Sequence, residues 1–299
     1  MPIHLKLFIA TVAWGATPTI GRVLASYEAP LVVVCGRFLV ATVFLFAFAL
    51  SRRALVPVAR RHWGAFLLLG LSGICLHNGL MYKGLEFTSA TTTSIILGLI
   101  ATQVVLLDVI FFRRVPDRWA VLGVAIAFVG TTYVLTGGRL TELAGLHLGL
   151  GELLIFLSGL SWAVYSVVGR RLLELYSPLV VTCYASLAGV IMMLPFPFGQ
   201  LEVTGTILAD PAALAMIFFL GSMGSALGFL WYYEAVVTMG TVGAAVYINL
   251  VPMFGLLSAA FFLGEEISAS VVGGGALVIG GLMLVNRPAR PRWNRVASS

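Results

Sequence analysis

The chain has 299 residues, of which 60% are hydrophobic and only 10% are charged, and its formal net charge is +6 at pH 7. A soluble domain carries about 25% charged residues, so this composition excludes an ordinary soluble globular protein. The three cysteines all fall within apolar stretches, which excludes a disulfide-stabilised secreted domain.

Apolar stretches of about 20 residues, separated by short charged segments, predict transmembrane helices and an all-α membrane protein. We expect ten spans, in chain order 4–25, 30–50, 63–83, 88–111, 117–137, 150–170, 177–199, 211–234, 241–263 and 268–286. The first span is too long for the apolar part of a signal peptide and lacks a small-residue cleavage site, so we expect it to be retained.

Basic residues gather on one side of these spans. With ten spans both termini share a side, and 14 of the 18 Lys and Arg residues fall there. The positive-inside rule then predicts an integral protein of the cell (inner) membrane with both termini in the cytoplasm. The basic C-terminal segment is interpreted as a topology anchor, and no nucleic-acid partner is expected.

The sequence of the first half recurs in the second. Trp14, Arg22, Pro30 and Cys35 return 148 positions later as Trp162, Arg170, Pro178 and Cys183. Gly70, Gly73, Tyr82, Gly123 and Gly130 return 151 positions later as Gly221, Gly224, Tyr233, Gly274 and Gly281. Internal repeats of this kind predict two five-helix units, residues 1–147 and 148–299.

Because each unit has an odd number of spans, the second unit is expected to enter the membrane from the opposite side. The loop charges agree, since Arg113-Arg114 after the fourth span corresponds to Gly264-Glu265 after the ninth. Lys83 and Glu234 depart from this polarity. Inverted repeats are typical of secondary transporters, whose halves exchange conformations around a site at the bilayer midplane.

Two tryptophans lie in the middle of their spans, whereas membrane tryptophans usually occupy the interfaces. Trp14 and Trp162 are either a symmetric packing plug or two aromatic walls of a central cavity. Thr17 and Tyr165 follow one turn later on the same helical faces and are candidates for the same site.

The third span carries His77 and Asn78, with Tyr82 one turn further along. Such groups are costly in hydrocarbon unless they face protein or water. His77 is therefore either a satisfied interhelical hydrogen-bond partner or a pathway residue that titrates near neutral pH.

Further candidates lie in the second unit and at two prolines. Tyr232, Tyr247 and Asn249 form a comparable polar and aromatic set among the substrate-binding candidates. Pro18 and Pro252 each remove a helical hydrogen bond within a span, and they are either hinges or ordinary prolines of membrane helices.

Residue types that are missing from the spans restrict the class of substrate. No Asp or Glu falls at a predicted midplane, which argues against a carboxylate-based proton antiporter and against a strongly cationic substrate. Arg37 stands alone within the second span, without the second cation that a phosphate site would use. A neutral or zwitterionic molecule with an apolar part fits best. No metal site and no cofactor are expected, and without HExxH, GxSxG or a midplane aspartate pair the chain is not expected to be an enzyme.

One stretch resembles a known family. Asn249-Leu250-Val251-Pro252, then Phe261-Phe262-Leu263-Gly264-Glu265 and glycines at 273–275, is similar to the repeat signature of EamA-type permeases in the drug/metabolite transporter superfamily. Ala101 and Arg113-Arg114 in the first unit depart from that signature. Within the family the chain looks most like the aromatic amino-acid exporters (YddG-like). The resemblance implies a cavity lined by spans one, three, four, six, eight and nine, with spans five and ten at the periphery.

The leading interpretation is a monomeric exporter of amino acids, with aromatic amino acids as one candidate class. It would work by alternating access and facilitated diffusion. Two alternatives stay open, namely export of other metabolites or drugs, and proton coupling through His77. A structural scaffold, in contrast, would tolerate the loss of Trp14, Trp162 and His77.

Overall fold

The computed structural model describes residues 1–24, 27–88, 93, 96–113, 117–139, 149–263 and 269–287, and every regular element within these ranges is helical. The elements of the first half are α1 (Ile3–Leu24), α2 (Pro30–Ser51), α3 (Trp63–Leu69), α4 (His77–Leu85), α6 (Ile100–Phe112) and α7 (Arg118–Leu135). Those of the second half are α8 (Leu150–Leu173), α9 (Pro178–Met193), α10 (Pro195–Gly199), α11 (Leu201–Ala209), α12 (Pro211–Phe219), α13 (Gly228–Ala245), α14 (Val251–Leu263) and α15 (Ala269–Val285).

Within the described ranges, six helical stretches are long and apolar enough to cross a membrane. They are Pro30–Ser51, Arg60–Leu85, Arg118–Leu135, Leu150–Leu173, Pro178–Gly199 and Pro211–Gly255. Ile3–Thr17, Ile96–Phe112 and Ala269–Val285 are shorter apolar helices. Each predicted span overlaps one of these stretches, while the count of ten and the inverted repeat stay predictions. Residues 89–92 and 94–95 of the predicted fourth span lie outside the described residues.

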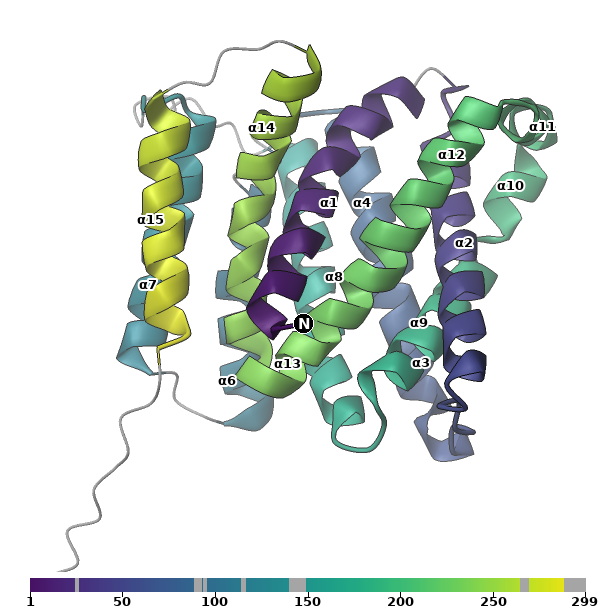
Figure 1. Ribbon diagram of the computed structural model, residues 1–299, viewed down its shortest axis with the longest axis horizontal. Coiled ribbons are helices and arrows are strands. Elements are labelled where there is room, and N and C mark those ends of the chain that lie inside the picture. The colour runs from purple at the N-terminus through teal and green to yellow at the C-terminus, as the bar shows by residue number, and fades with distance from the viewer. Residues whose placement is uncertain are drawn as a thin grey trace, which may run out of the picture.

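Gly240 interrupts the longest stretch, at the predicted boundary between the eighth and ninth spans. Its φ of 82° and ψ of 169° break the helix inside α13. A residue with a Cβ would be strained in this conformation. In Figure 1 the chain descends through α12 and α13 and then rises through α14.

Two π-helical segments were not predicted. Gly70–Leu76 lies between α3 and α4, and Leu220–Leu227 lies between α12 and α13. Each begins within one residue of the same point in its half of the chain, at Gly70 or just before Gly221. A π segment inserts extra backbone into a turn and is frequent at functional sites. Here the two segments set the angular position of the side chains that open α4 and α13.

Prolines explain two further differences from the predicted spans. Pro195 separates α10 from α9, and a helix, α11, occupies a stretch that was expected to be a loop. Pro252 is the second residue of α14, and α14 directly follows a 3-10 turn (Val246–Leu250). The backbone hydrogen bond that proline cannot donate therefore falls where the chain passes from 3-10 to α-helical geometry. Pro18 lies within α1, and its side chain is outside the described part.

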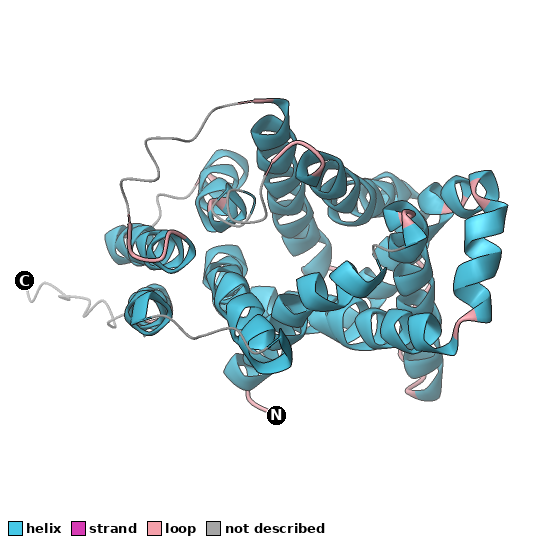
Figure 2. Ribbon diagram, turned by 90° about the horizontal axis from the view of Figure 1, so that it is seen from above, coloured by secondary structure: helices cyan, strands magenta, loops and turns pink. Residues whose placement is uncertain are grey.

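The helices α7 and α15 form a pair at one edge of the bundle (Figures 1 and 2). Gly123 faces the carbonyl of Gly281, and Gly130 faces the carbonyl of Gly274, so the two helices run in opposite directions. A Cβ added at any of these four glycines would lie 2.5–2.7 Å from the facing carbonyl oxygen. Without side chains at these positions the backbones approach closely, as small residues allow in membranes. We call this contact the glycine seam.

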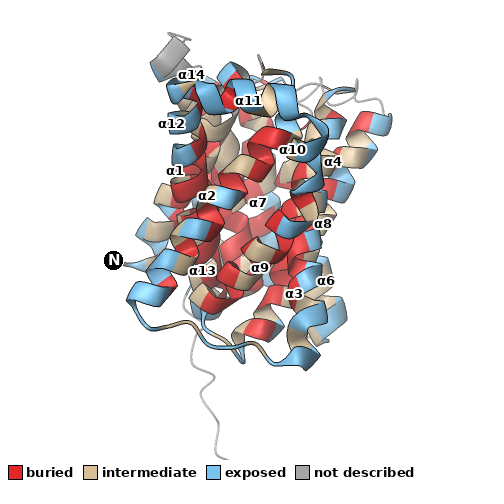
Figure 3. Cartoon of the chain, turned by 90° about the vertical axis from the view of Figure 1, so that its right-hand side faces the viewer, coloured by how far each residue is buried: buried red, intermediate tan, exposed pale blue. Residues whose placement is uncertain are grey.

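The core of the protein lies where the other helices meet. Buried residues line the inner faces of α2, α9 and α13, and exposed residues occupy the periphery (Figure 3). Gly70 packs against the backbone of Gly189 in α9, and Gly221 packs against the carbonyl of Arg37 in α2. The two π segments are thus each fixed against a helix from the other half of the chain.

Candidate functional site

An aromatic cluster occupies the centre of the bundle. Its members are Trp14, Phe38, Trp162, Tyr165, Phe229, Tyr232 and Tyr233, contributed by α1, α2, α8 and α13. The indole rings of Trp14 and Trp162 meet edge to face, with centroids 5.8 Å apart and planes at 85°. This geometry is the one that aromatic quadrupoles favour. The two tryptophans matched by the repeat are therefore in direct contact.

Trp162 is the hub of the cluster. Its ring lies 5.0 Å from that of Phe229 and 5.3 Å from those of Tyr165 and Tyr232. Its side chain is only 4% exposed. Tyr165, one turn away on α8, stacks on Tyr233 at 4.7 Å. The predicted helical face of Trp162 and Tyr165 is thus the face that meets α13.

Hydrogen bonds fix several of these rings. The Trp14 Nε1–H donates to the carbonyl of Gly224 in the second π segment, at 2.7 Å. The hydroxyls of Ser166 and Tyr232 are hydrogen-bonded at 2.6 Å. The Tyr233 hydroxyl donates to the carbonyl of Tyr165 at 3.1 Å. A buried ring with a fixed polar end has a defined orientation, so this wall of the site is preorganised.

Phe229 was missed by the sequence analysis. It contacts Trp14, Phe38, Trp162 and Tyr165 and so lies between the helices of the cluster. A signal was available, because positions 229, 232 and 233 follow the i, i+3, i+4 spacing of one helical face.

A polar group borders the aromatic cluster on the side of α4. The His77 imidazole lies 5.0 Å from the ring of Trp162, and its Nδ1 lies 3.1 Å from the Ser158 carbonyl oxygen. The Ser158 hydroxyl donates to the His77 carbonyl at 2.7 Å. His77 and Ser158 thus connect α4 with α8. The same contacts place the His77 ring against the cluster.

Asn78 and Arg37 complete this polar group. Asn78 is buried, and its amide Nδ2 donates to the carbonyl of Ile74 at 2.8 Å. Its Oδ1 accepts from Nη2 of Arg37, across from α2, at 3.5 Å. We call His77, Asn78, Arg37 and Ser158 the polar group.

The site is not symmetric between the two halves. The positions that correspond to Arg37, His77 and Asn78 are Ala185, Gly228 and Phe229. One half therefore supplies the polar atoms, and the other supplies much of the aromatic surface. An arrangement of this kind suits a molecule with one polar end and one apolar end.

The remaining predicted residues divide into two sets. Thr17 and Tyr82 are partly exposed, and Thr17 bonds the Ala13 carbonyl of its own helix at 3.0 Å. The Tyr247 hydroxyl is hydrogen-bonded to Nδ1 of His4 at 2.5 Å. The side-chain Oδ1 of Asn249 accepts a hydrogen bond from the hydroxyl of Thr131 in α7 at 3.4 Å. Within the described part of the chain, neither Tyr247 nor Asn249 has a ring contact or a hydrogen bond with a member of the aromatic cluster.

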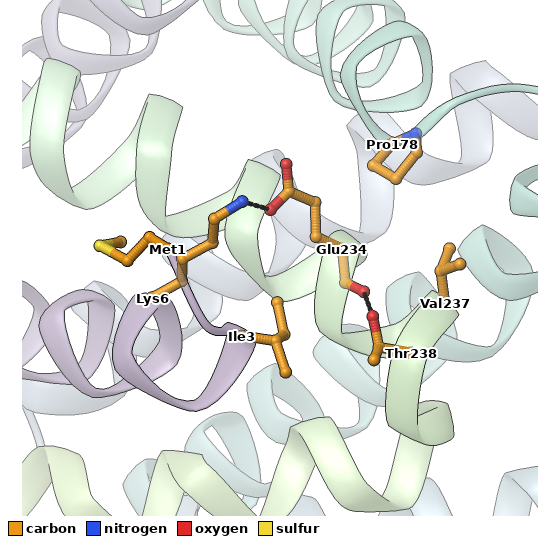
Figure 4. Close-up of a pocket in the computed structure, with 7 residues that line it drawn as sticks. All are labelled: Met1, Ile3, Lys6, Pro178, Glu234, Val237 and Thr238. Atoms are coloured by element: carbon orange, nitrogen blue, oxygen red, sulfur yellow. Dashed lines mark hydrogen bonds and ion pairs between the residues drawn. The ribbon is translucent and has the colours of Figure 1, made fainter.

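Ion pairs hold the helices together at the face of the bundle where α1 begins, here called the N-terminal face. Lys6 pairs with Glu234, and Figure 4 shows the two side chains facing each other between α1 and α13. Arg170 pairs with Asp108 at 2.7 Å, and Thr241 donates to the same carboxylate at 2.5 Å. The unexpected polarity of Glu234 has a physical explanation, because Lys6 compensates its charge.

Two shallow pockets lie away from the aromatic cluster. The pocket of Figure 4 has a volume of about 330 Å³ and is bounded by the chain's first residues, Pro178 and α13. A second pocket, of about 440 Å³, lies between Glu28, Glu86 and Phe196. Neither contains a predicted site residue.

At the opposite face, the Tyr27 hydroxyl donates to the Asp210 carboxylate and connects two loops. This bond, together with the Ala212 N–H, holds the pKa of Asp210 below its ordinary value. The charged carboxylate thus contributes stability above its unfolded pKa of about 3.9, and the contribution is lost as the pH falls through the lower folded pKa.

We therefore expect the melting temperature of the wild type to fall as the pH is lowered from about 5 to about 3. The Asp210→Asn variant should lose less over the same range. Glu202→Gln, which removes an exposed carboxylate from α11, serves as the control and should follow the wild type. Identical acid sensitivity in all three proteins would contradict a role for the Tyr27–Asp210 contact.

Comparisons with known proteins agree with this architecture. Residues 1–136 and 149–287 match the model of the EamA-like transporter family. A relative from Bacillus subtilis (strain 168) named "Uncharacterized transporter YyaM" is 27% identical over 97% of this chain and 97% of its own length. One from Streptantibioticus cattleyicolor named "Probable terminal-alkyne amino-acid exporter" is 30% identical over 74% of this chain and 72% of its own.

A solved crystal structure superposes with a TM-score of 0.74 over 96% of this chain and 99% of that chain. Its sequence identity is 17%, so the likeness concerns the fold alone. The family match, in contrast, covers both halves of the chain, and these matched residues include every member of the aromatic cluster. The chain therefore belongs to the EamA-like transporter family, within the drug/metabolite transporter superfamily.

Proposed function

We propose that this membrane transporter exports amino acids with apolar side chains, aromatic ones among them. The observation that carries the proposal is the contact of a polar group with an aromatic cluster at the centre of the bundle, where His77 lies 5.0 Å from Trp162. A zwitterionic head and an apolar side chain need such a pair of surfaces. The name of the Streptantibioticus cattleyicolor relative supports the same substrate class.

The proposed substrate contacts are the aromatic rings of Trp14, Trp162, Tyr165 and Tyr232 and the polar side chains of His77 and Asn78. Thr17 and Tyr82 extend this surface, because both are partly exposed. Tyr247 and Asn249 stay in the proposal as residues that would meet the substrate in another conformation, and Pro18 and Pro252 as hinges.

The proposed mechanism is alternating access by two inverted five-helix units, residues 1–147 and 148–299, which together make ten spans. Two observations support it, namely the matching positions of the π segments and the reciprocal contacts of the glycine seam, across which α7 and α15 run in opposite directions. The N-terminal face is proposed to be cytoplasmic, in the cell (inner) membrane. The Lys6–Glu234 and Asp108–Arg170 pairs would then close that side and open when substrate enters.

Facilitated diffusion is the proposed energetic mode. Asp108 and Glu234 are both occupied by ion pairs at the N-terminal face, so neither serves as a carboxylate that exchanges a proton for substrate at the centre. The exporter then moves amino acids down their own gradient, and the protein is proposed to act as a monomer.

Uptake into liposomes that contain only this protein tests the proposal. Labelled phenylalanine, tryptophan, methionine and threonine are offered with and without an imposed pH gradient. We expect saturable flux of the apolar amino acids without the gradient, and competition among them. Flux that requires the gradient would contradict facilitated diffusion and favour proton coupling through His77. If no amino acid is carried by a folded preparation under either condition, the amino-acid proposal fails in favour of other metabolites or drugs.

A further inference from the structure

Arg37 is a buried cation in the apolar interior of the protein. It lies in α2, about two turns into a helix of otherwise apolar and small residues, and its side chain is only 8% exposed. A buried guanidinium is rare in proteins unless it is paired. Its position beside the proposed substrate site therefore calls for an explanation.

The described residues leave the charge of Arg37 without a carboxylate. The four ion pairs of the described part use Lys6, Lys83, Arg170 and Arg287 as their cations, so Arg37 takes part in none of them. Its Nε is buried without a hydrogen-bond partner. What the protein provides is one long hydrogen bond from Nη2 to Asn78 and the face of the Phe38 ring, whose centroid lies 5.0 Å from the guanidinium carbon.

This arrangement is unfavourable without a ligand. Burying an uncompensated cation is strongly unfavourable, and one hydrogen bond at 3.5 Å offsets little of that cost. The guanidinium carries its donors in a planar fork whose spacing matches the two oxygens of a carboxylate. A carboxylate that arrives with the substrate would satisfy the free Nε–H and compensate the charge together.

The neighbours of Arg37 are suited to the same task. The Asn78 amide is fixed by its bond to Ile74, which directs Oδ1 at the guanidinium and holds the fork in place. His77 directly precedes Asn78 at the start of α4. The His77 ring in turn contacts Trp162. A carboxylate bound at Arg37 would therefore lie on the polar side of the aromatic cluster.

We infer that Arg37 binds the α-carboxylate of the transported amino acid, with Asn78 beside it on the polar side of the site and the aromatic cluster beside the side chain of the substrate. This inference rests on the proposed function, since it names the residue that recognises the substrate class. The absence of a matching cation at Ala185, the corresponding position of the second half, gives the substrate a single orientation.

Transport of phenylalanine, phenylalaninamide and 3-phenylpropionate by the full-length protein in liposomes tests the inference. We expect the wild type to prefer phenylalanine to the amide at least tenfold, about 1.4 kcal/mol, and to be inhibited by 3-phenylpropionate. Arg37→Gln should raise the KM for phenylalanine about tenfold, and both the preference over the amide and the inhibition should disappear. Arg52→Gln, which removes an exposed cation at the end of the same helix, should behave as the wild type.

The Asn78→Asp variant provides a second test, in which stability and substrate affinity are expected to change in opposite directions. Its carboxylate would pair with Arg37 inside the protein, so the melting temperature should rise while the affinity for phenylalanine falls. If Arg37→Gln does not fold, this variant and Arg37→Lys still decide the matter. Arg37→Lys keeps the charge without the fork and should keep the preference over the amide with a raised KM.

The two possible failures are distinguishable. If the wild type carries phenylalanine, but folded Arg37→Gln or Arg37→Lys retains wild-type KM and inhibition, the assignment of Arg37 is overturned while the amino-acid function stands. If the wild type carries none of the amino acids, both the function and the assignment fail. Equal transport of phenylalanine and its amide by the wild type would also overturn the assignment.

Discussion

Replacement of Trp162 by leucine should reduce amino-acid transport about a hundredfold, which corresponds to about 2.7 kcal/mol in transition-state stabilisation. Trp162 is the one residue of the aromatic cluster whose ring contacts both Trp14 and the polar group through His77. Leucine keeps the helix and much of the volume but removes all edge-to-face contacts. The apolar part of the substrate would then lose its fixed aromatic surface.

The same change also lowers stability, and the measurement must separate the two effects. Truncation of a buried tryptophan costs about 3 kcal/mol, since each aromatic pair contributes up to about 1.5 kcal/mol beyond its burial. Each variant is therefore compared after size-exclusion chromatography and a thermal melt, with flux normalised to folded protein. Trp162→Phe, which retains an aromatic ring, should recover part of the activity.

Trp63→Leu is the matched control. Trp63 opens α3 and is 60% exposed, so its loss should leave both flux and the melting temperature nearly unchanged. If well-folded Trp162→Leu transported amino acids at the wild-type rate, Trp14 and Trp162 would be a packing plug and the aromatic cluster would not be part of the substrate path.

The sequence alone predicted the parts of this site that depend on local periodicity and on the repeat. The equivalence of Trp14 and Trp162 and their mid-span depth pointed to a shared position, and the structure brings their rings together. The pairing of Trp162 with Tyr165 on one face of α8 follows from helical spacing alone.

What the sequence could not predict are contacts that depend on helix rotation and register. The π segments rotate α4 and α13 relative to an ideal helix, and this rotation decides which of His77, Asn78 and Phe229 meet the cluster. Asn249 looked equivalent to Asn78 as a polar residue within a span. Its carbonyl and side chain instead engage Thr131 of α7. No pattern within one helix encodes which neighbour it will face.

Gly281→Val should destabilise the protein by about 2–3 kcal/mol, whereas Gly280→Val, at the adjacent position of α15, should not. A Cβ at Gly281 would lie 2.5 Å from the carbonyl oxygen of Gly123 and 2.8 Å from the backbone nitrogen of Ala127. Backbone atoms cannot rotate aside as a flexible side chain does, so the two helices must move apart. At Gly280 nothing lies within 4 Å of the added Cβ.

Thermal unfolding in one detergent measures this difference directly, and a fall of about 5–10 °C is expected for Gly281→Val alone. The pair is informative because both variants make the same chemical change one residue apart, with the same gain in helix propensity. The helices α7 and α15 lie at the edge of the bundle, away from the aromatic cluster. The fraction of the Gly281→Val variant that remains folded should therefore retain the wild-type KM. Equal melting temperatures for the two variants would show that the glycine seam does not hold α7 against α15. A raised KM would show instead that the seam sets the geometry of the substrate site.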